Sequence, residues 1–513
     1  MKSQLFIRLL LPVFLLASAC GTKRLAVLKD DGKIEASFIQ INDVYEIAPL
    51  ANGTSGGMAR VGQLKKELKH NNPNTFMVMS GDFESPSVYN SLKFEGKAIR
   101  GRQMIDAMNV AGVDLAVFGN HEFDIKEDEL QDRINESEFQ WVSSNTFHLK
   151  NNTVAPFEKL KGGVLEKFPE SYILSIKDAD GTTAKIGFIG ITLPFNRADY
   201  VHYTDPLSSA KKIYNQIKDS VDVVVAVTHQ LMDDDVKLAS EIPGLHVIMG
   251  GHEHDMRLQK VGNVYITKAH ANAKSAFVIN LAIDKNTNQV NLNPVLKTLD
   301  STVLLDSTVN KVVNKWIAIA DSSFAEQGFD SKAVLLANSE PLDGREAEIR
   351  TKSTNLTRLI TNSMLKAYPD ADASIFNSGS IRVDDILNAP VTQYDIIRTM
   401  PFGGGVHLVE MKGNLLQQTL DAGMKNKGIG GFLQHGNINN EINNTWTVKG
   451  VKLDPEKVYK VVITDFLLSG KEANLDFLND KNPGILKIHP EENNPRNIKS
   501  DIRLLINDYL MGK

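Results

Sequence analysis

The chain has 513 residues, too many for one ordinary hydrophobic core, and two domains are the natural expectation. Apolar residues make up 42% and charged residues 23%, a composition typical of soluble globular proteins. The net charge of -5 is small for this length and excludes broad binding of nucleic-acid polymers, which needs clustered positive charge.

The first residues predict export. Residues 1–19 contain basic residues, then an apolar run over Leu9–Leu16 that is too short to cross a bilayer, then small residues. Cys20 is the only cysteine and follows Ala-Ser-Ala, which resembles the lipobox of bacterial lipoproteins. We therefore expect a signal peptide, followed by a lipid-anchored lead over residues 20–34 at the outer membrane, periplasmic or on the cell surface. The alternative is a plain secretory signal with an incidental cysteine.

Short apolar runs rich in β-branched residues then alternate with helical patterns. This repetition of strand, loop and helix predicts a layered α/β domain over residues 35–300. Strands are expected at Ala36–Ile41, Phe76–Ser80, Leu115–Phe118, Lys185–Ile191, Val221–Thr228 and Val247–Met249, and helices at Gly57–His70, Gly101–Ala111 and Ser208–Ser220.

A second unit follows a connecting segment, predicted over residues 301–348. Its apolar pattern over Leu304–Phe324 predicts a connecting helix, and the Gly-, Asp- and Ser-richer stretch Ala325–Glu348 suits a linker. Residues 349–513 then predict a smaller α/β domain, in which the Asn-rich stretch Asn437–Asn444 is expected as a surface loop. Its helices are expected at Asn355–Tyr368 and Asn414–Lys425, and its strands at Ala373–Phe376, Val406–Lys412 and Val458–Thr464.

Metal-ligand side chains follow several predicted strands. Ligands of open α/β sheets gather beyond the carboxyl ends of strands, so these clusters should converge. Asp, Asn and His donors suit Zn²⁺, Mn²⁺ or Fe rather than Ca²⁺. A lone Gly-Asp after a strand is usually a turn, but all the clusters in this order are specific together. They are Asn42-Asp43, Gly81-Asp82, the run from Gly119 to Asp124, His229 and the run from Gly250 to His254.

These motifs resemble those of the calcineurin-like metallophosphoesterases and, more narrowly, of the bacterial and ecto-5′-nucleotidases. The resemblance covers nearly the whole mature chain. It implies a four-layer metallophosphoesterase domain, joined by a helix to a second, smaller α/β domain, and two divalent metal ions. By this resemblance Asp82 bridges both ions, Asp43 and His254 hold the first, and Asn120, His229 and His252 hold the second.

The same resemblance matches His121 and Asp124 to a catalytic pair, in which the carboxylate orients an imidazole that stabilises the transition state. The alternative for Asp124 is an N-cap of the following helix. The family's first motif is usually Asp-x-His, whereas this chain has Tyr45 two residues after Asp43. Tyr45 is either a phenolate ligand, which would favour trivalent iron, or a residue that only lines the site.

Substrate-binding candidates lie in the second domain. Arg350 stands at its head, and Asn377 and Arg382 belong to a segment that resembles the family's Asn-x-Gly-x-x-Arg signature. Arginine forks bind phosphate oxygens bidentately. Phe402, beside a glycine run, and Phe466, at a strand end, match the two phenylalanines that sandwich the nucleobase. The alternatives are ordinary surface arginines and core phenylalanines.

The resemblance implies an exported dinuclear-metal phosphohydrolase that removes the 5′-phosphate from nucleotides for scavenging. A 2′,3′-cyclic-nucleotide phosphodiesterase or nucleotide-sugar diphosphatase could use the same metals. A non-catalytic nucleotide-binding lipoprotein is a further alternative, supported by Tyr45 and by Glu472, which stands where the family has a ribose-binding Asp. We expect a monomer that binds nucleotides and reaches the membrane only through its lipid.

Overall fold

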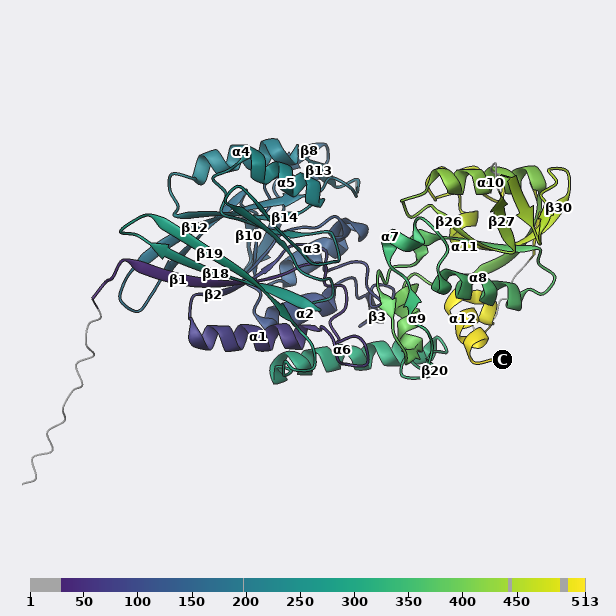
Figure 1. The fold of residues 1–513 in the computed structure, drawn as a ribbon, viewed down its shortest axis with the longest axis horizontal. Coiled ribbons are helices and arrows are strands. Elements are labelled where there is room, and N and C mark those ends of the chain that lie inside the picture. The colour runs from purple at the N-terminus through teal and green to yellow at the C-terminus, as the bar shows by residue number, and fades with distance from the viewer. Residues whose placement is uncertain (1–28, 197, 442–444, 490–496, 513) are drawn as a thin grey trace, which may run out of the picture.

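The computed structural model describes residues 29–196, 198–441, 445–489 and 497–512 (Figure 1). The predicted signal peptide and Cys20 lie outside the described residues. Within the described part, no helix combines the length and the apolar character needed to cross a membrane. The chain forms an N-terminal domain and a smaller C-terminal domain that lie side by side (Figure 1).

Two six-stranded sheets form the centre of the N-terminal domain. Large apolar side chains such as Phe38, Phe188 and Phe277 are buried in the core between them. One sheet has the order β19-β18-β1-β2-β5-β6, with bounds Gln289–Thr298, Ser275–Asp284, Lys33–Ile41, Thr75–Met79, Leu115–Ala116 and Gln140–Trp141. The other has the order β11-β12-β14-β15-β17-β16, with bounds Ser171–Lys177, Thr183–Thr192, Val223–His229, Val247–Gly251, Val264–Lys268 and Arg257–Val261.

Helices cover the outer faces of both sheets, which completes the predicted four layers (Figure 1). Helices α1 (Met58–Asn71), α2 (Arg102–Ala111) and α6 (Ser307–Glu326) pack on the first sheet, and α4 (Pro206–Ile217) and α5 (Met232–Glu241) on the second. The predicted connecting helix is α6. It is part of the N-terminal core, because fully buried Trp316 packs there and donates a hydrogen bond to Asp106 Oδ2 at 3.0 Å.

Shorter elements surround the sheets of the N-terminal domain. The predicted pattern does not include the strands among them, because these strands are brief and mostly exposed. They are β3 (Lys93–Phe94), β4 (Lys97–Ala98), the 3-10 turn η1 (His121–Asp124), α3 (Glu127–Glu136), β7 (Thr146–Lys150), β8 (Thr153–Ala155), β9 (Glu158–Lys161), β10 (Val164–Lys167) and β13 (Val201–Tyr203).

Each of the two central sheets contains a set of parallel strands. β1, β2 and β5 are parallel neighbours in the first sheet, and β12, β14 and β15 in the second. Their carboxyl ends therefore lie at one edge of each sheet, and the loops that follow carry the predicted metal ligands.

A five-stranded sheet, ordered β26-β22-β30-β25-β31, forms the C-terminal domain. Helices α8 (Asn355–Ala367) and α12 (Ile502–Leu510) cover one face and α10 (Gly413–Lys425) the other. The strands are β22 (Ala373–Asn377), β25 (Val406–Lys412), β26 (Leu433–Gly436), β30 (Val458–Thr464) and β31 (Ile485–Ile488). Smaller elements are β20 (Val334–Leu336), β21 (Leu342–Asp343), α7 (Glu346–Ile349), η2 (Ser378–Ser380), β23 (Ile386–Leu387), β24 (Val391–Thr392), α9 (Gln393–Thr399), α11 (Asp465–Leu468) and η3 (Ile498–Ser500).

The Asn-rich stretch Asn437–Asn444 is not only a surface loop, and that prediction was wrong. Strand β27 (Ile438–Glu441) lies within it and pairs antiparallel with β28 (Thr445–Val448), which continues to β29 (Val451–Lys452). The physical reason is Ile438, which is buried against the C-terminal core and holds an otherwise polar strand in place.

Candidate active site

The predicted ligands lie in one cluster at the strand ends. Single ligand atoms of Asp43, Asp82 and His229 lie within 4.8 Å of one another, and all three residues are buried. His254 Nε2 lies 3.7 Å from Asp43 Oδ1. The fifth loop brings in His252, whose ring centroid is 5.4 Å from that of His229. The last predicted ligand, Asn120, has its Oδ1 3.2 Å from His252 Nδ1.

The backbone of this cluster is strained. Asp43, Asp82 and His252 adopt left-handed conformations with φ of 53°, 57° and 87°. Such residues each cost about 1–3 kcal/mol and persist where surrounding structure holds them, often at functional sites. Gly119 allows the close packing, because a Cβ atom at this position would lie 2.1 Å from Asp82 Oδ1. The cluster is therefore held in place by its loops.

Glu122 braces two of these loops, a role that its place in the Gly-Asn-His-Glu run does not reveal. Its buried carboxylate accepts hydrogen bonds from the backbone N–H groups of Asp82 at 2.9 Å, Phe83 at 2.7 Å and Gly119 at 2.5 Å. Burial, and then the charge of Asp82, raises the pKa of Glu122 to about 7. The brace ties the loop after β2 to the loop after β5.

The electrostatics of the cluster favour a bound cation. Burial alone would lower the pKa of His229, but Asp82 and Asp43 outweigh it and raise that pKa to about 10. Burial, and then His229, lowers the pKa of His252 to about 3, which leaves a neutral imidazole, the form that binds metals. His229 Nε2 is buried without a well-aligned hydrogen-bond partner, although Asp82 Oδ2 lies 3.1 Å away. The donor set therefore fits a metal site.

Tyr45 points its hydroxyl into the same cluster. The oxygen lies 3.0 Å from His254 Nε2, 3.2 Å from Asp82 Oδ2 and 3.4 Å from Asp43 Oδ1. The side chain is buried, with 6% of its surface exposed. The phenol thus stands among the ligands of the predicted first ion, where the resemblance places a histidine.

His121 and Asp124 form a pair beside this cluster. His121 Nδ1 lies 2.6 Å from Asp124 Oδ2, and the backbone N–H of His121 donates to Asp82 Oδ1 at 2.8 Å. Asp124 also accepts from Ser85 Oγ at 3.1 Å and from Asn196 Nδ2 at 2.5 Å. Asp124 is not an N-cap of the next helix, because it ends the 3-10 turn η1 and α3 has Lys126 at its N-cap.

The C-terminal domain reaches the catalytic pair. Arg382 Nη2 lies 3.1 Å from His121 Nε2, across the boundary between the domains. Arg350 lies in an ion pair with Glu346, and the positive charge of Arg382 is close enough to contribute to lowering its pKa, after burial. Both predicted arginines therefore stand on the side of the C-terminal domain that faces the metal cluster.

Asn377 and Glu472 meet on the same domain. Asn377 ends β22, and its Nδ2 donates to Glu472 Oε2 at 2.7 Å. Asn377 Oδ1 accepts from Ser380 Oγ at 2.6 Å. The Glu472 carboxylate thus lies next to a predicted substrate residue.

Phe402 and Phe466 stand at neighbouring strand ends. The register of β25 and β30 pairs Val406 with Thr464, and Asp465 Oδ2 accepts from Gly405 N at 3.0 Å. The two loops are therefore tied together. The phenylalanines are 64% and 42% exposed, which is far more than core residues show. Their exposure suits an aromatic platform.

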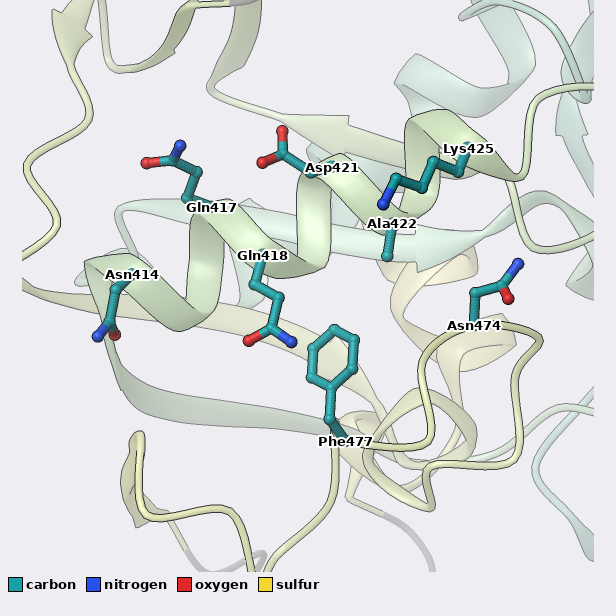
Figure 2. Close-up of a pocket in the computed structure, with 8 residues that line it drawn as sticks. All are labelled: Asn414, Gln417, Gln418, Asp421, Ala422, Lys425, Asn474 and Phe477. Carbon is teal, nitrogen blue, oxygen red and sulfur yellow. The ribbon is translucent and has the colours of Figure 1, made fainter.

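A hollow of about 570 Å³ lies elsewhere on the C-terminal domain. Figure 2 shows Phe477 and Asn474, on the loop after α11, near the side chains of Gln418 and Ala422 on α10. None of the residues that line this hollow belongs to the metal cluster or to the predicted substrate set. The converging ligands, and not this hollow, locate the candidate active site.

Comparisons with known proteins agree with this arrangement. Residues 36–256 match the family model of the calcineurin-like phosphoesterases, and residues 335–479 match that of the 5′-nucleotidase C-terminal domain. The 5′-nucleotidase of Bos taurus is 24% identical over 480 residues, which cover 82% of this chain and 78% of the bovine protein. The chain therefore has a calcineurin-like phosphoesterase domain followed by a 5′-nucleotidase C-terminal domain. These matched domains make it a metal-dependent phosphoester hydrolase.

Other similar proteins carry names that indicate different activities. The trifunctional nucleotide phosphoesterase protein YfkN of Bacillus subtilis is 25% identical over 442 residues, which cover 78% of this chain and 28% of that protein. A 5′-nucleotidase precursor from Thermus thermophilus shares the fold, with a TM-score of 0.69, 21% identity and coverage of 93% of this chain and 96% of that one. The Thermus thermophilus sulfate thiohydrolase SoxB also shares it, with a TM-score of 0.65, 14% identity and coverage of 93% and 94%. The fold of this chain therefore does not by itself decide the substrate.

Proposed function

We propose that this chain removes the 5′-phosphate from nucleoside monophosphates. The observation that carries the proposal is the 3.1 Å contact between Arg382 of the C-terminal domain and His121 beside the metal cluster. A phosphate bound by the arginine would lie next to the predicted catalytic pair. The names of the relatives, among them the bovine 5′-nucleotidase, support the same substrate class.

We assign two metal ions of Zn, Mn or Fe to the cluster. Asp43, Asp82, Tyr45 and His254 would hold the first ion, and Asp82, Asn120, His229 and His252 the second. Two such ions polarise a phosphate ester and activate water. A phenol in place of a histidine adds a hard oxygen donor, which favours a harder cation such as trivalent iron at the first position.

The residues of the chain then have separate tasks. Asp124 accepts from His121 Nδ1, which leaves Nε2 to face the substrate and stabilise the phosphoryl oxygens or the leaving group. Arg382 and Arg350 would neutralise and orient the phosphate. Phe402 and Phe466 would stack on the base, and Glu472 would accept from a ribose hydroxyl.

We also propose that the protein is exported and lipid-anchored through Cys20. The support is the signal-like sequence that ends at the only cysteine of the chain. Cys20→Ser should lose membrane attachment when cells are fractionated. A mature Cys20→Ser protein in the membrane pellet would contradict the anchor.

A phosphate-release assay over a substrate panel tests the proposed activity. The panel is a nucleoside 5′-monophosphate, a 3′-monophosphate, a 2′,3′-cyclic nucleotide, a nucleotide sugar and p-nitrophenyl phosphate. We expect the 5′-monophosphate to have the highest kcat/KM. A higher value for the cyclic nucleotide or the nucleotide sugar would replace the proposal with that activity, and no turnover of any substrate would indicate a binding protein.

Arg382→Met sharpens the assay. Because a charged hydrogen bond to phosphate contributes about 1.5–3 kcal/mol, kcat/KM should fall by about 10- to 100-fold. Arg358→Met is the matched control, since Arg358 is an exposed arginine on α8 of the same domain. Equal activity of the two variants would remove Arg382 from the site.

A further inference from the structure

Two histidines of the metal cluster are oriented from different parts of the chain. His229 Nδ1 donates to the backbone oxygen of Ser80 at 2.7 Å, within the N-terminal domain. His254 Nδ1 lies 2.5 Å from Asp384 Oδ2, which belongs to the C-terminal domain, 130 residues further along the chain. Among the residues that the structure describes, Asp384 is the hydrogen-bond partner of His254 Nδ1, and no group of the N-terminal domain bonds to that nitrogen. The orientation of His254 therefore depends on the other domain.

The second nitrogen of His254 faces the cluster. Its Nε2 lies 3.0 Å from the Tyr45 hydroxyl and 3.7 Å from Asp43 Oδ1. A carboxylate that accepts a hydrogen bond from Nδ1 keeps the proton on that atom and leaves the lone pair of Nε2 free for a metal. It also fixes the ring plane and makes the imidazole a better donor.

Asp384 is itself held in place. Its second carboxylate oxygen, Oδ1, accepts from the backbone N–H of Glu346 at 2.5 Å. Its backbone has φ of 36°, a left-handed conformation that is uncommon for residues other than glycine and often marks functional positions. The segment on either side also reaches the N-terminal domain, through Arg382 to His121 and through Asp385 to Lys274 at 2.7 Å.

We propose that Asp384 is a positioning residue for the first metal ion, acting through His254. The proposal rests on the metal-dependent function proposed above. In this arrangement the carboxylate, the histidine and the metal position form a chain of contacts that spans the two domains. Affinity for that ion and closure of the domains are then linked, because whatever favours one must favour the other.

Calorimetric titration of the chelator-treated full chain with Mn²⁺ tests this link. The wild type should bind two ions. Asp384→Asn keeps an acceptor without charge, and Asp384→Gly removes the side chain, while both residues tolerate the left-handed backbone. Loss of an outer partner of a metal ligand typically costs about 10- to 100-fold in affinity. We expect the affinity for one ion to fall by about 10-fold in Asp384→Asn and about 100-fold in Asp384→Gly, with the other ion unaffected.

Asp385→Asn is the matched control. It removes the ion pair with Lys274 at the same domain boundary but touches no metal ligand, so both ions should bind as in the wild type. An equal loss in Asp385→Asn, a loss for both ions in Asp384→Gly, or unchanged binding in both Asp384 variants would overturn the proposal. So would a wild type that binds no Mn²⁺.

Phosphate release from a nucleoside 5′-monophosphate and from p-nitrophenyl phosphate is measured on the same samples. Absence of turnover in a wild type that binds two ions would overturn the proposed function, while the titration would still decide the role of Asp384. A wild type that hydrolyses phosphate with Asp384 variants that bind both ions normally would overturn only this inference.

Discussion

The two domains present their site residues in opposite ways. In the N-terminal domain Asp43, Asp82 and His229 are buried, with backbone and side-chain partners that hold each of them. In the C-terminal domain Phe402 and Phe466 project into solvent. Groups that stabilise a transition state are most effective when they are fixed in advance, away from water. Groups that capture a substrate must first be accessible to it.

This contrast explains the contacts at the boundary. From the C-terminal domain, Arg382 touches His121 beside the cluster and Asp384 touches His254 within it. Phe402 and Phe466 remain exposed to solvent, away from these contacts. A substrate held by the aromatic rings and the arginines would therefore present its phosphate to the metal side, and domain closure is a natural way to deliver it.

Loss of the Asp82 carboxylate, which is predicted to bridge both ions, should have the largest effect on activity. Asp82→Asn should lower kcat for every substrate by more than about 100-fold, because the loss of even an outer partner of a metal ligand costs about 10- to 100-fold. Turnover of the nucleotide and of p-nitrophenyl phosphate is measured together, since both should fall alike. Asp132→Asn, at a half-exposed aspartate of the same domain, should keep full activity. Near-normal turnover in Asp82→Asn would contradict the metal mechanism.

Loss of the two aromatic side chains should distinguish the role of the C-terminal domain from that of the metal site in the N-terminal domain. Phe402→Ala and Phe466→Ala should each weaken nucleotide binding by about 10- to 100-fold, since base stacking contributes about 1–3 kcal/mol. A substrate without a base should be hydrolysed as by the wild type. The measured quantity is the ratio of kcat/KM for the nucleotide to that for p-nitrophenyl phosphate.

Leu486→Ala is the control for this pair, because Leu486 is an exposed apolar residue on β31 of the same domain. Its ratio should equal that of the wild type. A ratio that also stays constant in both phenylalanine variants would mean that neither ring stacks on the base.

Removal of metal should have the smallest effect, a modest loss of stability that falls mainly on one domain. An ion present at about 100 times its dissociation constant stabilises its domain by about 2.7 kcal/mol. A chelator should thus lower the Tm of the N-terminal domain by roughly 5–11 °C, at about 2–4 °C per kcal/mol for a domain of this size. The Tm of the C-terminal domain should move less, because that domain contributes Asp384 as a partner of His254 but no proposed metal ligand. Calorimetry with and without chelator checks this, and an unchanged N-terminal transition would contradict the metal site.

Local pattern placed the parallel strands that lead to the ligands, but it missed β6, β11, β16, β17, β18 and β19 of the two central sheets. Strands β25 and β30 have the predicted bounds, and the predicted ligands Asp43, Asp82 and His229 lie together. The reason is that an apolar strand which ends in metal-ligand residues is a contiguous signal, and parallel strands bring their ends to one edge. From such motifs the sequence alone predicted the metal ligands, the catalytic pair and the substrate-binding candidates.

Only the tertiary structure decided the contacts between distant segments. It placed α6 in the N-terminal core and β27 in a strand pair, made Glu122 a brace, and brought Asp384 to His254 over 130 residues of chain. Each of these depends on which surfaces meet when the layers and domains pack. Helical and strand periodicities describe one segment at a time, so they carry no information about a partner that packing alone brings near.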